Sequence, residues 1–89
     1  MKIQVEKPSE EKLKSLGVKD WPVWTKEKSR FDWEYGSQET CFILEGKVMV
    51  TLASGETAEF GKGDLVIFPK GLKCVWEVKE AVKKHYKFE

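Results

Sequence analysis

Glu39 is the acidic residue whose position points to chemistry, because the sequence predicts that it lies on an aromatic face. Successive residues of a strand face opposite sides, so three aromatic side chains of the segment 29–36 share one face: Phe31, Trp33 and Tyr35. The same alternation, carried through the following turn, adds three residues to this face: Glu39, Cys41 and Ile43. A carboxylate there must be paired, metal-bound or protonated, since an isolated buried charge is too costly. Glu39 is therefore a candidate general acid or base.

Lys84 is the candidate partner of this carboxylate. In the segment 81–88 one face carries an apolar set that includes this single lysine: Val82, Lys84, Tyr86 and Phe88. An inward pair of Glu39 and Lys84 would satisfy both charges, with Lys84 as charge partner or anion anchor. Two alternatives stay open, a purely structural ion pair and a lysine whose ammonium reaches solvent at the rim. The only histidine, His85, has the opposite parity and is expected to face water.

The walls around these charges are expected to be aromatic and to leave a partly open pocket. Four Trp and five Phe are many for a chain of 89 residues. The candidate substrate-binding residues are Trp24, Phe31, Trp33, Tyr35, Cys41, Cys74 and Trp76. The alternative for each is core packing, since aromatic side chains dominate small cores and a free cysteine commonly behaves as a small buried hydrophobe.

Metal ligands are few at the inward positions. A divalent transition metal prefers several His, Cys or carboxylate groups that converge on one point. The inward positions offer Glu39, Cys41, Cys74 and Tyr35. Zinc would accept the two thiolates and the carboxylate, but the set favours a protein without metal or other cofactor.

One short helix and a series of strands are expected to position these residues. Ser9 as N-cap, the two acids that follow it and Gly17 as terminator predict a helix over 9–16, with Leu13 and Leu16 on its buried side. Turn signals divide the rest into β-branched and aromatic runs. Strands are expected at 22–26, 29–36, 39–45, 47–53, 57–60, 64–68, 72–78 and 81–88. This pattern predicts an all-β antiparallel sandwich or barrel.

Composition indicates one small domain over 1–89, with the barrel at about 22–88. The net charge of +1 makes nucleic acid an unexpected partner, and the sequence shows neither a signal peptide nor a membrane span. We therefore expect a cytoplasmic protein, monomer or homodimer, with two free thiols. Charged residues make up 35% and asparagine is absent, a bias typical of thermophiles.

Two spacings resemble the sequence motifs of the cupin superfamily, namely Glu39-x6-Gly46 and Gly63-x5-Pro69-x-Gly71-x2-Cys74. The resemblance implies a small jelly-roll β-barrel. In cupins the histidines and the glutamate of these motifs point into the barrel and usually hold a metal. Here the positions of the histidines fall on Trp33 and Tyr35, or on Asp32 and Glu34 with the longer spacer, and on Cys74.

Further motifs resemble single-domain cupins grouped with (S)-ureidoglycine aminohydrolase and with the ethanolamine-utilisation cupin: Phe31-x-Trp33, the run 41–46, Gly63-Asp64 and Lys84-x-Tyr86. The resemblance implies a site inside the barrel, lined by Trp33, Glu39, Cys74 and Lys84. Aminohydrolase activity itself is not expected, because the histidines that help to hold its manganese are absent. Two function classes stay open: an enzyme with Glu39 as general acid or base, and a non-catalytic module that binds or senses a small metabolite.

Overall fold

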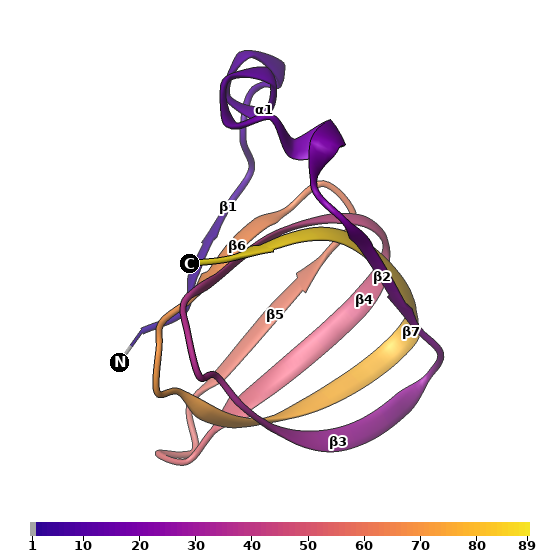
Figure 1. Ribbon diagram of the computed structural model, residues 1–89. Helices are drawn as coiled ribbons and strands as arrows, with labels where there is room; N and C mark the ends of the chain where they lie inside the picture. Colours follow the sequence, from indigo (N-terminus) through magenta and orange to yellow (C-terminus); the bar gives the residue numbers. More distant parts are fainter. Residues whose placement is uncertain (1) are drawn as a thin grey trace.

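Seven antiparallel strands curve around a common axis and form one sheet (Figure 1). The computed structural model describes residues 2–89. Its strands are β1 (Gln4–Glu6), β2 (Val23–Lys26), β3 (Ser29–Glu34), β4 (Glu39–Leu52), β5 (Thr57–Gly61), β6 (Leu65–Phe68) and β7 (Lys73–Phe88). This is a small all-β barrel of the jelly-roll kind, so the fold predicted from the sequence is confirmed.

The two long strands, β4 and β7, form the frame of the barrel. They pair with each other from Glu39 opposite Phe88 to Leu52 opposite Cys74. Strands β2 and β3 add to β7, and strands β5 and β6 add to β4. Because each long strand carries further strands on its other edge, the sheet wraps around the inward-facing side chains. Those side chains form the core: Tyr35, Cys41, Ile43, Val48, Val50, Phe60, Val66, Phe68, Leu72, Cys74, Trp76, Val78 and Val82.

Both long strands correct the sequence prediction, which divided each of them into two. The chain does not turn at Gly46, which has a φ of 104° and lies where the register between β4 and β7 shifts. Such a bulge bends a strand without ending it. A Cβ at Gly46 would lie 2.4 Å from the carbonyl oxygen of Ala81. Glycine is therefore needed here because the backbone of β7 approaches closely, and not for a hairpin turn.

The helix α1 (Glu10–Leu16) lies outside the barrel, at the top of Figure 1. Its ends are as predicted, because Ser9 Oγ accepts a hydrogen bond from the Lys12 N–H at 3.2 Å and Gly17 takes a φ of 70°. The expected burial of Leu16 is wrong, since 41% of this residue is exposed and no helix residue is buried. The helix has seven residues and lies outside the barrel, so the sheet does not cover both leucines. A 3-10 turn, η1 (Val18–Asp20), follows and buries Val18.

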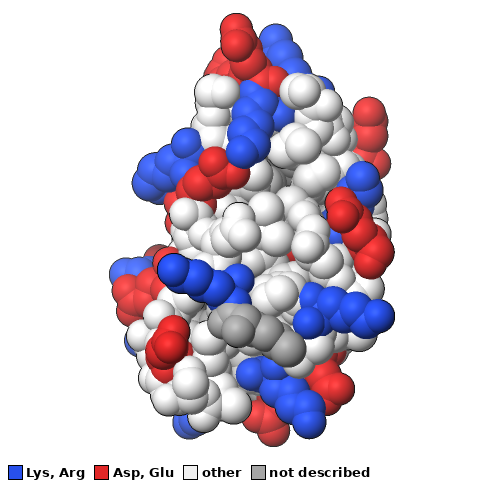
Figure 2. Space-filling view, turned by 90° about the vertical axis from the view of Figure 1, so that its left-hand side faces the viewer, with Lys and Arg blue, Asp and Glu red and all other residues white. Residues whose placement is uncertain are grey.

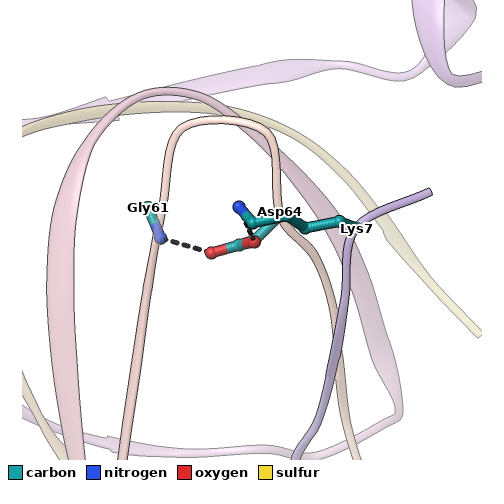
Figure 3. Close-up of polar contacts among 3 residues, drawn as sticks. All are labelled: Lys7, Gly61 and Asp64. Atoms are coloured by element: carbon teal, nitrogen blue, oxygen red, sulfur yellow. Dashed lines mark hydrogen bonds and ion pairs between the residues drawn. The ribbon is translucent and has the colours of Figure 1, made fainter. Parts of the chain in front are cut away.

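The N-terminal strand β1 was not predicted; it has only three residues, and all three are exposed. It pairs with β6, Glu6 forms an ion pair with Lys12, and Lys7, directly after the strand, forms one with Asp64 (Figure 3). Asp64 Oδ1 accepts from Lys7 Nζ at 3.0 Å, and Oδ2 accepts from the Gly61 N–H at 2.8 Å. Asp64 therefore fixes the turn between β5 and β6 and ties the segment after β1 to it.

Basic and acidic side chains are interspersed on the face shown in Figure 2, with no extended region of one sign. Because the charges are mixed, this face offers no continuous positive track for a phosphate backbone.

Within residues 2–89, no helix is long and apolar enough to cross a membrane.

Candidate functional site

A cavity of about 180 Å³ lies among β2, β3, β4 and β7. Its lining consists of seven aromatic residues and two charged ones: Trp24, Phe31, Trp33, Tyr35, Glu39, Trp76, Lys84, Tyr86 and Phe88. Trp33 and Phe88 each keep 47% of their surface exposed. A concave, mostly aromatic space with a few polar groups is the usual form of a small-molecule site.

Strand alternation and register bring these side chains together. Every second residue at the end of β7 faces the cavity, which accounts for Lys84, Tyr86 and Phe88. The two edge neighbours of β7 complete the walls, since Trp24 on β2 lies opposite Lys84 and Phe31 on β3 lies opposite Trp76. Glu39, the first residue of β4, lies opposite Phe88.

Glu39 and Lys84 form a buried ion pair, as the alternation predicted. Lys84 Nζ lies 2.8 Å from Glu39 Oε2, and the two side chains are only 6% and 4% exposed. The alternative of a lysine that reaches solvent at the rim is therefore wrong. The ammonium also lies 4.8 Å and 4.7 Å from the ring centres of Trp24 and Trp76. The carboxylate and two indole faces together replace the water that the ammonium loses.

Two residues that line the cavity, Glu39 and Tyr35, keep unused hydrogen-bonding capacity. Among residues 2–89, Glu39 Oε1 has no hydrogen-bond partner, and no fully buried polar side-chain atom lacks one. Oε1 therefore keeps contact with open space. The Tyr35 hydroxyl accepts from Trp76 Nε1 at 3.2 Å, and its own hydrogen has no acceptor within this part of the chain. Burial and the negative charge of Glu39 raise the pKa of Tyr35 far above its usual range, so the hydroxyl stays a donor.

The structure brings seven of the nine predicted site residues to the cavity and leaves out Cys41 and Cys74. Cys41 is fully buried in the core, and Cys74 borders a separate depression beside Trp33 and Leu52. Burial raises the pKa of Cys41 to about 12 and that of Cys74 to about 11. Both are free thiols that stay protonated near neutral pH, and a protonated thiol is a poor nucleophile.

Tyr86 and Phe88 were not among the predicted site residues, although the signal was present. They continue the alternation that placed Lys84 inside. His85 corrects another expectation, because it is half-buried and its Nδ1 lies 2.9 Å from the carbonyl oxygen of Trp21. The segment before β2 covers this outer face of β7, which the sequence of β7 alone does not reveal.

The residues present do not fit the metal centre that the cupin motifs specify. Within residues 2–89, no three His, Cys, Asp or Glu side chains come close enough to hold one ion. The zinc set considered from the sequence is not assembled among these residues, and neither Cys41 nor Cys74 lines the cavity that Glu39 lines. The positive charge beside Glu39 is supplied by Lys84. That the protein carries no metal cofactor stays a prediction.

The small jelly-roll barrel, the inward Glu39 and the motif residues Gly46, Gly63 and Gly71 are together the features of the cupin class. The chain belongs to the family of the EutQ-like cupin domain, whose sequence profile matches residues 13–86. No curated protein matches the chain.

Solved structures agree with this assignment. A DUF861 family protein from Thermotoga maritima is 56% identical, with a TM-score of 0.98, and the match covers 99% of this chain and 100% of that one. Its source accords with the thermophile composition. The EutQ protein of Clostridium difficile is 22% identical with a TM-score of 0.66, over 72% of this chain and 50% of that one. A putative ethanolamine utilization protein Q from Salmonella typhimurium is 26% identical with a TM-score of 0.65, over 72% and 51%. The chain thus spans about half the length of the two EutQ proteins.

Proposed function

We propose that the chain binds a small molecule in the barrel cavity, against the ion pair of Glu39 and Lys84. One observation carries the proposal: an aromatic cavity of about 180 Å³ surrounds a buried pair of charges. A barrel with a purely structural role is more stable when apolar side chains fill such a space, since buried ion pairs are costly to desolvate. The volume lies below the usual range for drug-sized ligands, which indicates a small metabolite. Two free cysteines suit the reducing cytoplasm.

A second candidate is an enzyme in which Glu39 transfers a proton to or from the bound molecule. The free Oε1 of Glu39 favours it, because a general acid or base must come within hydrogen-bond reach of the reacting group. Lys84 would be the charge partner of Glu39 or the anchor for a developing negative charge. Hydrolysis of ureidoglycine is not part of this proposal, because the ligand set for its metal is replaced here.

The binding proposal is tested by screening a library of small metabolites with protein NMR. Three of the four indoles, Trp24, Trp33 and Trp76, line the cavity, whereas Trp21 does not. A ligand in the cavity is expected to shift the Nε1–H signals of these three and to leave that of Trp21 unchanged. A library that shifts none of the three, or only Trp21, would overturn the proposal.

The two candidates differ in what happens to the bound compound. The spectrum of each hit is followed over hours with the wild-type protein and with Glu39→Gln. A hit converted by the wild type and left intact by the variant supports proton transfer by Glu39. Hits that stay intact with both proteins support a binding or sensing module.

A further inference from the structure

The charges that line the cavity cancel, which restricts the charge of the ligand. Among residues 2–89, Glu39 and Lys84 are the only charged residues that line the cavity, and Lys84 Nζ lies 2.8 Å from Glu39 Oε2. A cationic ligand would meet the ammonium, and an anionic one would meet the carboxylate. Either would bring an unpaired charge into an aromatic cavity, which is costly. The faces of Trp24 and Trp76, which would otherwise attract a cation, already hold the ammonium of Lys84.

The free hydrogen-bonding capacity restricts the polar groups of the ligand. Glu39 Oε1 is an acceptor without a partner among residues 2–89, so it calls for an N–H or O–H group. The Tyr35 hydroxyl has a hydrogen without an acceptor in the same part of the chain, so it calls for a carbonyl or similar oxygen. A ligand that leaves either group without a hydrogen-bond partner binds poorly, because an unsatisfied buried polar group is costly.

The walls restrict the shape. Apart from the ion pair, the lining is entirely aromatic, with Trp33 and Phe88 half-exposed at its border. Flat groups gain most from aromatic walls, because offset stacking and edge contacts add to the buried area. The volume of about 180 Å³ has room for a single substituted ring.

We infer that the cavity takes a small, flat, uncharged compound in which a hydrogen-bond donor stands next to an acceptor. A primary carboxamide on an aromatic ring is the simplest member of this class. Its N–H groups match Glu39 Oε1, and its carbonyl oxygen matches the Tyr35 hydroxyl. This inference rests on the proposed function, since it names the ligand class of the same site.

Three probes of nearly the same shape test the inference. Benzamide is neutral, benzoate is an anion and benzamidinium is a cation. Each is titrated into the wild-type protein, and its Kd is measured from the indole Nε1–H signals of Trp24, Trp33 and Trp76. Benzamide is expected to bind at least about tenfold more tightly than either charged probe, because only benzamide leaves the ion pair balanced.

Variants of the pair should change the ranking in opposite directions. Glu39→Gln leaves the cavity positive and is expected to favour benzoate over benzamide, whereas Lys84→Met leaves it negative and should favour benzamidinium. Tyr35→Phe removes one hydrogen bond and should weaken benzamide by about tenfold. Glu34→Gln serves as the matched control, because Glu34 is exposed and pairs with Lys73 outside this cavity, and it should change none of the affinities.

The wild-type ranking decides the inference even if a variant fails to fold. Benzoate or benzamidinium binding as tightly as benzamide would overturn the ligand class and leave the binding proposal intact. Metabolite hits in the cavity without binding of benzamide would overturn the class as well. Absence of both metabolite hits and probe binding would overturn the inference together with the proposed function.

Discussion

Lys84 lies opposite Trp24 in the β2–β7 pair, with its ammonium 4.8 Å from the centre of the indole ring. The short edge strand β2 therefore contributes directly to the environment of the buried charge. The second indole, Trp76, lies eight residues earlier on the same long strand as Lys84. The site thus depends on an edge strand that is held by a single neighbour, β7.

The first prediction concerns the coupling of Glu39 and Lys84. Glu39→Gln and Lys84→Met are each expected to lower the free energy of unfolding by about 3–5 kcal/mol, because the remaining partner stays buried without its counter-charge. The double variant should show an interaction energy of at least about 0.5 kcal/mol, as is usual for residues in direct contact. Urea unfolding of the four proteins measures it.

An exposed ion pair on neighbouring strands provides the control for this cycle. Lys73 and Glu34 lie 3.7 Å apart, with side chains 73% and 62% exposed. Because solvent screens such pairs, the changes in unfolding free energy caused by Glu34→Gln and Lys73→Met should be almost additive. Additive effects at Glu39 and Lys84 as well would show that these two residues are not energetic partners.

The second prediction concerns the indole of Trp24. Trp24→Leu removes one of the two indole faces that contact the ammonium of Lys84. The free energy of unfolding is expected to fall, because a desolvated cation–π contact contributes about 2 kcal/mol. The loss in unfolding free energy should therefore be smaller in the Lys84→Met background than in the wild type. Equal losses in both backgrounds, measured by urea unfolding, would show that Trp24 acts only through packing.

Strand alternation placed Glu39 and Lys84 on inward faces, because the face of a strand residue follows from its parity, and the need of each charge for a partner suggested their contact. Parity gives the face but not the depth along the barrel. Cys41 shares the inward face with Glu39, yet it lies in the core and outside the cavity. Depth depends on how the paired long strands curve around the core, which no local pattern of residues encodes.

The long strands themselves were predicted as pairs of shorter ones for a related reason. A glycine in a β-rich sequence indicates a turn, a bulge or a close approach, and the sequence does not distinguish them. At Gly46 the backbone of β7 approaches closely, whereas Gly55 lies in the turn between β4 and β5. The contact that decides the matter, with Ala81, comes from a strand far away in the sequence.

The third prediction compares these two glycines. Both have positive φ, 104° at Gly46 and 93° at Gly55, so alanine is strained at either by about 1–2 kcal/mol. A new Cβ at Gly55 meets nothing within 4 Å, whereas at Gly46 it lies 2.4 Å from a backbone oxygen. Gly46→Ala should therefore cost more than about 4 kcal/mol or prevent folding. Similar unfolding midpoints for the two variants would contradict the close approach of β7 to Gly46 on β4.

The fourth prediction is that the purified protein carries no stoichiometric transition metal. In the part of the chain that the structure describes, the cavity lining holds one carboxylate, already paired with Lys84, and no imidazole. Elemental analysis of protein purified without chelators measures the content. About one metal per chain, lost in Glu39→Ala and kept in Glu34→Ala, would contradict the prediction and restore a metal site at Glu39.

The last prediction concerns the pH dependence of stability that arises from Cys41. Burial raises the pKa of its thiol from 9.0 to about 12. Between these two values the unfolded chain releases the proton while the folded chain keeps it, so rising pH favours unfolding. Well below pH 9.0 both states are protonated, and the thiol contributes no pH dependence.

Comparison with Cys41→Ala isolates this contribution from that of the other groups that titrate in the same range. As the pH rises above 9.0, the wild type should lose unfolding free energy relative to the variant, by about 1.4 kcal/mol per pH unit. Urea unfolding at a series of pH values measures the difference. A difference that stays constant across this range would mean that Cys41 ionises as readily in the folded barrel as in the unfolded chain, which contradicts its burial.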